Sequence, residues 1–239
     1  MQLKKLTKHI YYTQNDPKGD RPTLGYIAGN KSAVMIDAGN SAAHNALFLG
    51  LLKENRLKKP DACVLTHWHW DHTFGLHALN METYAHTKTN EKLREIAKWK
   101  WDDDAMRQRL ADGTEIAFAD ENIRMEYADP QKIRVVPTGN DIQEEITFDC
   151  GGITCHCLHL PSAHSDDSIA AFIPEEKIIF IGDIYGDDFY NNHSRNLDKT
   201  KALYDRLLEM DFTTAVPGHS APLSKDELLD FLGSFAAQK

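Results

Sequence analysis

Four side chains that bind metal ions well lie within six consecutive residues, in the segment Thr66-His67-Trp68-His69-Trp70-Asp71-His72. This H-x-H-x-D-H cluster directly follows the apolar stretch 62–65, which reads as a buried strand. Imidazole and carboxylate groups suit zinc and similar divalent ions. A lone histidine is more often a packed or solvated side chain, but four donors together at a strand end indicate a metal site. The sequence therefore predicts metal ligands at His67, His69, Asp71 and His72.

Further ligands are expected from other parts of the chain, because four donors in one loop cannot easily close around one ion. A rigid strand end holds a ligand better than a mobile loop does. Three residues follow predicted strands in this way: His164 after 153–160, Asp183 after the apolar run 178–182, and His219 after 215–218. Taken singly, each could be a capping aspartate or an exposed loop histidine. Their shared position at strand ends predicts that they complete the metal site.

The elements that must position these residues are short strands and amphipathic helices. Runs of β-branched and aromatic residues between turn residues predict strands, and apolar side chains at four-residue spacing predict helices. The expected strands are 9–13, 23–28, 33–37, 62–65, 132–136, 153–160, 168–173, 177–181 and 214–216. The expected helices are 41–55, a short helix from 71 to about 80, a helical region 87–112, 198–210, and a last helix after 224.

Capping residues are expected to define where the helices begin. Ser41, Asp104 and Asp198 are the predicted N-caps of three of them. Ser224 and Glu227 form a capping box at the start of the last helix.

The order of the elements predicts an α/β protein. Strands followed by a helix and a further strand occur in both halves, which suggests two α/β units packed sheet to sheet with helices outside. No linker or low-complexity tract interrupts the chain. We therefore predict a single domain over residues 1–239 with a helical insertion at about 87–112.

Composition limits the classes of partner. The hydrophobic content of 41% is enough for a proper core, and no stretch approaches the roughly 18 apolar residues that span a bilayer, so no membrane partner is expected. The formal charge of −9 repels phosphate backbones and disfavours nucleic acid. Residues 1–9 are basic but no apolar segment follows, so a cytoplasmic location is expected. The four cysteines include no C-x-x-C pair and read as reduced core thiols.

The motifs, in this order along the chain, resemble the metallo-β-lactamase superfamily. The resemblance rests on the stretch Ala-Val-Met-Ile-Asp-Ala-Gly at 33–39, the H-x-H-x-D-H cluster, H-S-x-x-S from His164, Gly182-Asp183 and Pro217-Gly218-His219. It covers nearly the whole chain. It implies a four-layer αβ/βα sandwich with the metal site along one edge of the two sheets.

The resemblance also implies a role for each ligand. One ion would be held by His67, His69 and His164; a second would be held by Asp71, His72 and His219; and Asp183 would bridge the two. Asp37 corresponds to a residue that orients the histidine loop. The expected cofactors are two zinc ions per chain, with iron or manganese as alternatives.

Two divalent ions that share a water lower its pKa towards neutrality and provide a hydroxide nucleophile. We therefore predict a dinuclear metal-dependent hydrolase of a small ester, lactone, thioester or amide, acting through a hydroxide that bridges the metals. Asp71 would also orient this hydroxide or accept its proton. Tyr185 resembles a tyrosine of lactone-cleaving members that donates to the substrate oxygen, and Trp70 is expected to line the substrate pocket.

Two other functions stay open. Iron at the same ligands would give an oxidoreductase, similar to the sulfur dioxygenases, that consumes oxygen in a reaction with a small thiol. A metal-binding protein without catalysis is disfavoured by the complete ligand set. The same ligands serve enzymes that cut C–N, C–O, C–S and P–O bonds, so they predict hydrolysis of a small molecule without naming the substrate.

Overall fold

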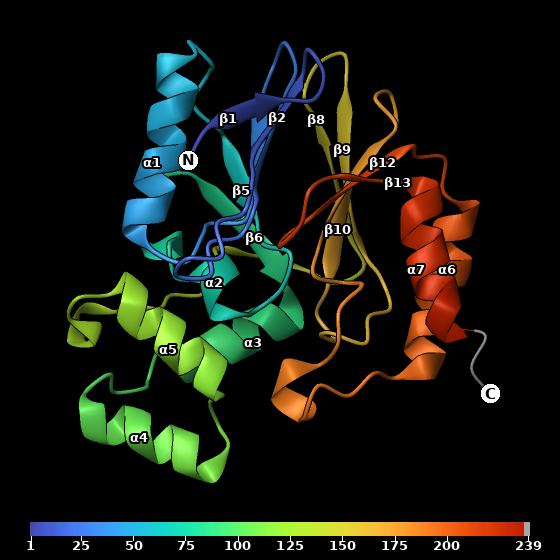
Figure 1. Cartoon of the computed structure of the whole chain (residues 1–239). Helices are drawn as coiled ribbons and strands as arrows, with labels where there is room; N and C mark the ends of the chain where they lie inside the picture. Colours follow the sequence, from blue (N-terminus) through green and yellow to red (C-terminus); the bar gives the residue numbers. More distant parts are fainter. Residues whose placement is uncertain (237–239) are drawn as a thin grey trace.

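Two β-sheets lie face to face with helices on their outer sides in the computed structural model, which describes residues 1–236 (Figure 1). The strands of the first sheet follow one another in chain order: β1 (Leu3–Lys5), β2 (Ile10–Thr13), β3 (Leu24–Ala28), β4 (Ala33–Ile36), β5 (Ala62–Val64), β6 (Glu82–His86) and β7 (Asn140–Ile142). The second sheet has the order β13-β12-β11-β10-β9-β8, with β8 (Glu145–Asp149), β9 (Thr154–His159), β10 (Ile169–Ile173), β11 (Ile178–Gly182), β12 (Thr214–Pro217) and β13 (Leu223–Ser224).

Helices connect the parallel strands and cover the outer faces of the sheets. Strands β4 to β7 pair in parallel, as do β11 and β12, and such pairs need crossover connections. The helices are α1 (Ala42–Glu54), α2 (Trp70–Thr73), α3 (Thr87–Ile96), α4 (Asp103–Asp112), α5 (Ala117–Glu126), α6 (Leu197–Glu209) and α7 (Lys225–Ala236). Short 3₁₀ turns are η1 (Leu76–Ala78), η2 (Pro130–Lys132) and η3 (Phe189–Asn191). None of the helices within residues 1–236 combines the length and apolar character that crossing a bilayer requires.

Three apolar cores hold four layers together. The inner faces of the two sheets meet in one core, where Val34 and Val64 belong to the same cluster as Cys157 and Ile169. Side chains such as Phe48 and Leu93 join α1 and α3 to the first sheet in a second core. A third core joins α6 and α7 to the second sheet through Leu203, Leu207 and Leu228. The predicted four-layer αβ/βα sandwich is therefore confirmed (Figure 1).

The predicted strand at 132–136 is wrong. Residues 130–132 form η2, and residues 133–137 lie outside any helix or strand. Ile133 and Val135 are nevertheless buried in the core beneath the first sheet. Their alternation therefore reflects two side chains that anchor an irregular segment to this core.

Two predicted helix starts are confirmed. The Ser41 hydroxyl accepts a hydrogen bond from the His44 N–H at the start of α1. At α7, the Ser224 N–H donates to the Glu227 carboxylate, and the Glu227 N–H donates to the Ser224 hydroxyl, which completes the capping box.

Two predicted N-caps are wrong by two residues each. The carboxylate of Asp102 caps α4 by accepting from the Ala105 N–H, so Asp104 lies within the first turn. Asn196 caps α6, and Asp198 also lies within the first turn. In both helices the predicted acidic residue stabilises the N-terminus through the helix dipole, while the capping side chain lies two residues earlier.

The buried hydroxyl of Tyr26 provides a test of the core that joins α1 and α3 to the first sheet. It donates to the Lys58 carbonyl oxygen (2.9 Å), and burial raises the pKa of Tyr26 to about 12. The folded state therefore holds this proton more tightly than the unfolded state, where the pKa is about 10. This contribution to stability, up to about 3 kcal/mol, is complete below pH ~10 and is lost as the pH rises towards 12.

The substitution Tyr26→Phe should remove this part of the alkaline destabilisation, while the lost hydrogen bond costs about 1 kcal/mol at neutral pH. Urea unfolding of both proteins across the alkaline range measures the difference. If the free energy of unfolding fell equally with pH in both proteins, the raised pKa of Tyr26 would be contradicted.

Candidate metal centre

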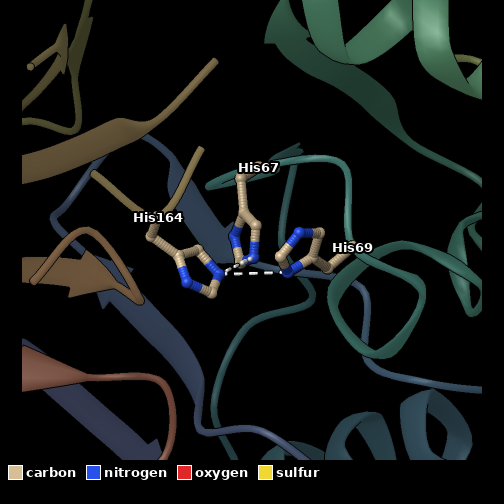
Figure 2. A group of neighbouring side chains, drawn as sticks. All are labelled: His67, His69 and His164. Carbon is tan, nitrogen blue, oxygen red and sulfur yellow. Dashed lines mark hydrogen bonds between the residues drawn. The ribbon is translucent and has the colours of Figure 1, made fainter. Parts of the chain in front are cut away.

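Three histidines from two loops converge at one edge of the sandwich. His67 and His69 come from the loop after β5, and His164 comes from the loop after β9 (Figure 2). Nε2 of His164 lies 3.2 Å from Nε2 of His67 and 3.0 Å from Nδ1 of His69. All three side chains are buried, and their nitrogens lie within 4.8 Å of one another. This is close enough for one ion to contact all three.

In two of these rings, the hydrogen bond made by Nδ1 determines that Nε2 carries the free lone pair. Nδ1 of His164 lies 2.7 Å from the carbonyl oxygen of Asp187, which can only accept, so Nδ1 carries the hydrogen and Nε2 carries the lone pair. Nδ1 of His67 lies 3.1 Å from the Thr66 hydroxyl, which itself donates to Asp37. Nδ1 of His67 therefore donates as well. Both Nε2 lone pairs then face each other, an arrangement that a cation stabilises.

Protonation does not relieve this crowding of lone pairs. Burial lowers the pKa of His67 and His69 well below the ordinary value, and the neighbouring imidazoles lower it further. The rings are therefore held neutral, which is the form that binds metal.

A second group lies beside the first and contains carboxylates. It consists of Asp71 and His72 from α2, Asp183 after β11 and His219 after β12, with ligand atoms within 4.8 Å of one another. Nε2 of His219 lies 2.9 Å from Asp71 Oδ2 and 3.3 Å from Asp183 Oδ2. Nε2 of His72 lies 3.0 Å from Asp71 Oδ2. The structure thus brings all seven predicted ligands together in two adjacent groups.

Asp183 lies between the two groups. Its Oδ2 is 3.5 Å from His72 Nε2 and 3.8 Å from His164 Nε2. Among the described residues, Asp183 Oδ1 is buried without a hydrogen-bond partner, and His72 Nε2, although 3.0 Å from Asp71 Oδ2, makes no hydrogen bond either. Such orphaned polar atoms are costly, and a coordinated cation would satisfy both. The donor types and the orphaned atoms therefore fit divalent metal ions.

The carboxylates of the second group hold positive charge beside them. Burial alone would lower the pKa of His72 and His219, but the carboxylates of Asp71 and Asp183 outweigh burial and raise it well above the ordinary value. Burial likewise opposes ionisation of Asp183, but His219 and His72 keep its pKa well below the ordinary value. The carboxylates therefore stay ionised and attract positive charge into the group.

Asp37 lies next to the second group and orients His72 within it. It follows β4 with a left-handed φ of 62°. Its Oδ1 accepts from the Thr66 N–H (2.7 Å), and its Oδ2 accepts from Nδ1–H of His72 (2.8 Å). The bond to Nδ1 turns Nε2 of His72 towards Asp71 and Asp183, in agreement with the geometry of an outer partner of a metal ligand.

The variant Asp37→Asn should lower metal affinity by about 10- to 100-fold. Asparagine tolerates the positive φ and can still accept from the Thr66 N–H, but its amide group cannot also accept from His72 as a carboxylate does. Zinc titration against a chromophoric chelator measures the affinity. Asp61→Asn is the matched control, since Asp61 accepts from the Ala33 N–H at the opposite end of β4. Equal affinities in the two variants would contradict the role of Asp37.

A cavity of about 260 Å³ opens onto both groups. Tyr185 lines it, and its ring also packs against Phe231 at 5.7 Å between centroids. Burial raises the pKa of Tyr185, so the phenol keeps its proton at neutral pH. Trp70 reaches the same cavity but is 3% exposed and packs edge-on against Phe74 in the core that joins α1 and α3 to the first sheet.

Several cavity residues were missed by sequence reasoning. Asp20 has a φ of 51° and its carboxylate lies 3.5 Å from Nδ1 of His219. Burial, with the charge of Asp71 next, raises the pKa of Asp20 to about 7. The other missed residues are Ile116, Phe118 and Ala119 at α5, Gly186, and Phe189 and Tyr190 at η3. Asp20 lies in a turn that contains ordinary turn residues, so no pattern distinguishes it.

A family model described as "Metallo-beta-lactamase superfamily" matches residues 19–219. The chain belongs to this superfamily. The matched region includes every residue of the two ligand groups. Hydrolase chemistry and metal binding are thereby supported at the level of the superfamily.

Two curated members of the superfamily share part of their sequence with this protein. The acyl-coenzyme A thioesterase MBLAC2 from Homo sapiens is 25% identical over 181 residues, and the protein of the same name from Bos taurus is 24% identical over 181 residues. Each alignment covers 71% of this chain but only 60% of the relative.

Solved structures show the shared fold. The metallo-β-lactamase from Pontibacter korlensis superposes with a TM-score of 0.69 at 18% identity, over 99% of both chains. The sec-alkylsulfatase Pisa1 from Pseudomonas sp. gives a TM-score of 0.71 at 16% identity, over 98% of this chain and 41% of that chain. Identities this low support the architecture and carry no information on substrate.

Proposed function

We propose that this protein is a dinuclear metal-dependent hydrolase of a small ester, lactone, thioester or amide. The observation that carries the proposal is the position of Asp183 between two adjacent ligand groups that open onto one cavity. One ion would be held by His67, His69 and His164, the other by Asp71, His72 and His219, with Asp183 shared between them. Zinc suits this set of imidazoles and carboxylates best, and iron or manganese are alternatives.

Bound divalent ions would supply Lewis acidity and a nucleophile at neutral pH. The protein's own groups would then position the substrate and move protons. Asp71 lines the cavity and can orient the attacking water or accept its proton. The Tyr185 hydroxyl, which keeps its proton at neutral pH, can donate to the substrate oxygen as charge develops there. Trp70 contributes to the wall beside Asp71.

Thioesters are the first substrates to try. The curated relatives carry the name acyl-coenzyme A thioesterase, and thioester cleavage needs the same nucleophile and oxygen stabilisation as ester cleavage. The net charge of −9 favours a small molecule over nucleic acid as the substrate. We also propose that the chain is one domain with a helical insertion at about 87–112; the start of α5, which follows this insertion, lines the cavity.

Metal analysis by mass spectrometry, on protein purified without chelators or added metal, tests this proposal. Close to two zinc ions per chain, with turnover of esters or thioesters that chelators abolish, is the expected result. Close to one iron, with oxygen uptake in the presence of small thiols, would instead indicate an oxidoreductase. Bound metal without any turnover would indicate a binding protein.

A further inference from the structure

The cavity at the metal centre has an apolar face opposite the ligands. Ile116, Phe118 and Ala119 line this face from the start of α5, and Phe189 lines it from η3. Phe118 is 55% exposed and Phe189 is 37% exposed, which is unusual for phenylalanine in a protein with three filled cores. Large apolar side chains left exposed at a concave site mark a place where an apolar ligand group binds.

A buried hydrogen bond fixes the two parts of this face relative to each other. The Tyr190 hydroxyl, from η3, donates to Glu115 Oε1 at 2.8 Å. The same oxygen accepts from the Ile116 N–H at 3.0 Å, immediately before α5 begins. Glu115 is 7% exposed, so the bond is shielded from water. The contact therefore joins η3 to the start of α5, although the two segments are far apart in sequence.

The same tyrosine also connects the apolar face to the metal centre. Its ring packs against the rings of His69, at 5.1 Å between centroids, and Trp68, at 4.8 Å. On its other side lies a second cavity of about 380 Å³, whose lining includes Lys88, Lys92 and several aspartates. Tyr190, like His69 and His164, lines both cavities, so it lies where an apolar space meets a polar one.

We propose that the apolar face binds the acyl chain of the substrate, that Phe118 and Phe189 determine which chains are accepted, and that Glu115 positions Tyr190 as the boundary of this site. The inference rests on the proposed hydrolase function and adds its substrate class, an ester or thioester with an aliphatic acyl group. The acyl carbon chain lies along α5 and η3, while the reacting carbonyl faces the ligand groups.

Binding of straight-chain fatty acids, from butyrate to laurate, tests the acyl site directly. Calorimetric titration of the zinc-loaded protein should show tighter binding as the chain grows, by up to about fourfold for each methylene that becomes buried. The carboxylate end is the same throughout, so the dependence on length reports on the chain alone. Phe118→Ser should flatten this dependence. Met125→Ser is the matched control, because Met125 is 57% exposed on the same helix but does not line the cavity.

Hydrolysis of the para-nitrophenyl esters of the same acids tests the positioning role. In Glu115→Ala, the KM of the laurate ester should rise by about tenfold relative to the butyrate ester, with a much smaller change in the ratio of the kcat values. Glu115→Gln should restore the preference, since its amide oxygen can still accept from Tyr190. A general loss of stability would change both esters alike and would not be rescued in this way.

The outcomes separate this inference from the proposed function. Unchanged length dependence in Phe118→Ser and Glu115→Ala, or equal loss in Met125→Ser, would overturn the acyl site. Length-dependent binding that Phe118→Ser removes, without hydrolysis of any ester or thioester, would support the acyl site and overturn the hydrolase proposal.

Discussion

Replacement of His69 by alanine is expected to abolish hydrolysis and to reduce the metal content of the protein. His69 provides one of only three nitrogens in the first group, with Nδ1 3.0 Å from Nε2 of His164. Two imidazoles do not close a coordination shell that prefers four ligands. Loss of an outer partner of a ligand already costs about 10- to 100-fold in affinity or activity, so loss of the ligand itself should cost more than 100-fold.

Metal analysis and ester or thioester turnover of His69→Ala, measured on the same preparation, check this expectation. His156→Ala is a suitable control, since His156 lies on β9 and its ring contacts the Thr147 hydroxyl, away from both ligand groups. The control should keep the metal content and turnover of the wild type. Full activity in His69→Ala would rule out the assignment of the first group.

The amount of metal that His69→Ala retains also reports on coupling between the groups. If the variant kept about half of the metal of the wild type, Asp71, His72 and His219 would hold their ion independently of the first group. Loss of nearly all would show that Asp183, 3.8 Å from His164 and 3.5 Å from His72, depends on both ions for its position.

The candidate ligands could be predicted from sequence because each lies at the end of a strand with a strong local pattern. β5, β11 and β12 are short apolar runs: β11 ends directly before Asp183, while β5 ends at Val64 and β12 at Pro217, shortly before His67 and His219. A strand that is buried in a sandwich must be apolar, and its end must lie at an edge of the sheet. Because several such strand ends lie at one edge, the polar residues that follow them can be expected to meet even when the pairing of the strands is unknown.

The remainder of the cavity depends on tertiary packing that no local pattern encodes. Glu115 and Tyr190 lie far apart in sequence and meet only because η3 folds against the start of α5. Strands β6 and β7 are not predicted for a similar reason, since each pairs in parallel with a strand that is distant in sequence. Strand β8 is not predicted either, although it pairs with the next strand, β9. Helix α5 begins without a side-chain cap, so its start carries no sequence signal.

The second large effect is expected from Gly218→Ala, which should disable the metal centre without removing a ligand. A Cβ atom at Gly218 would lie 2.1 Å from Asp183 Oδ1 and 2.9 Å from His72 Cε1, both far inside contact distance. The backbone cannot easily retreat, because the Gly218 N–H donates to the Gly182 carbonyl at 2.9 Å and its own carbonyl accepts from the Thr23 N–H at 2.7 Å. The clash must therefore displace the carboxylate of Asp183.

A displacement of about 1 Å at a reacting centre can cost about 100-fold in rate, so kcat/KM should fall by at least that factor. Metal analysis should show a loss of bound ions, because Asp183 lies within reach of both groups. Gly50→Ala is the matched control: Gly50 lies within α1 with no atom within 4 Å of the added Cβ. It should keep full activity and gain about 1 kcal/mol of stability from helix propensity.

Wild-type metal content and turnover in Gly218→Ala would show that Asp183 is not needed where the structure places it. The expected loss would instead explain why glycine precedes His219. The chain must pass so close to Asp183 and His72 that no side chain fits, and this close passage is what brings His219 to within 3.3 Å of Asp183. The geometry of the second ligand group would then depend on the absence of a single methyl group.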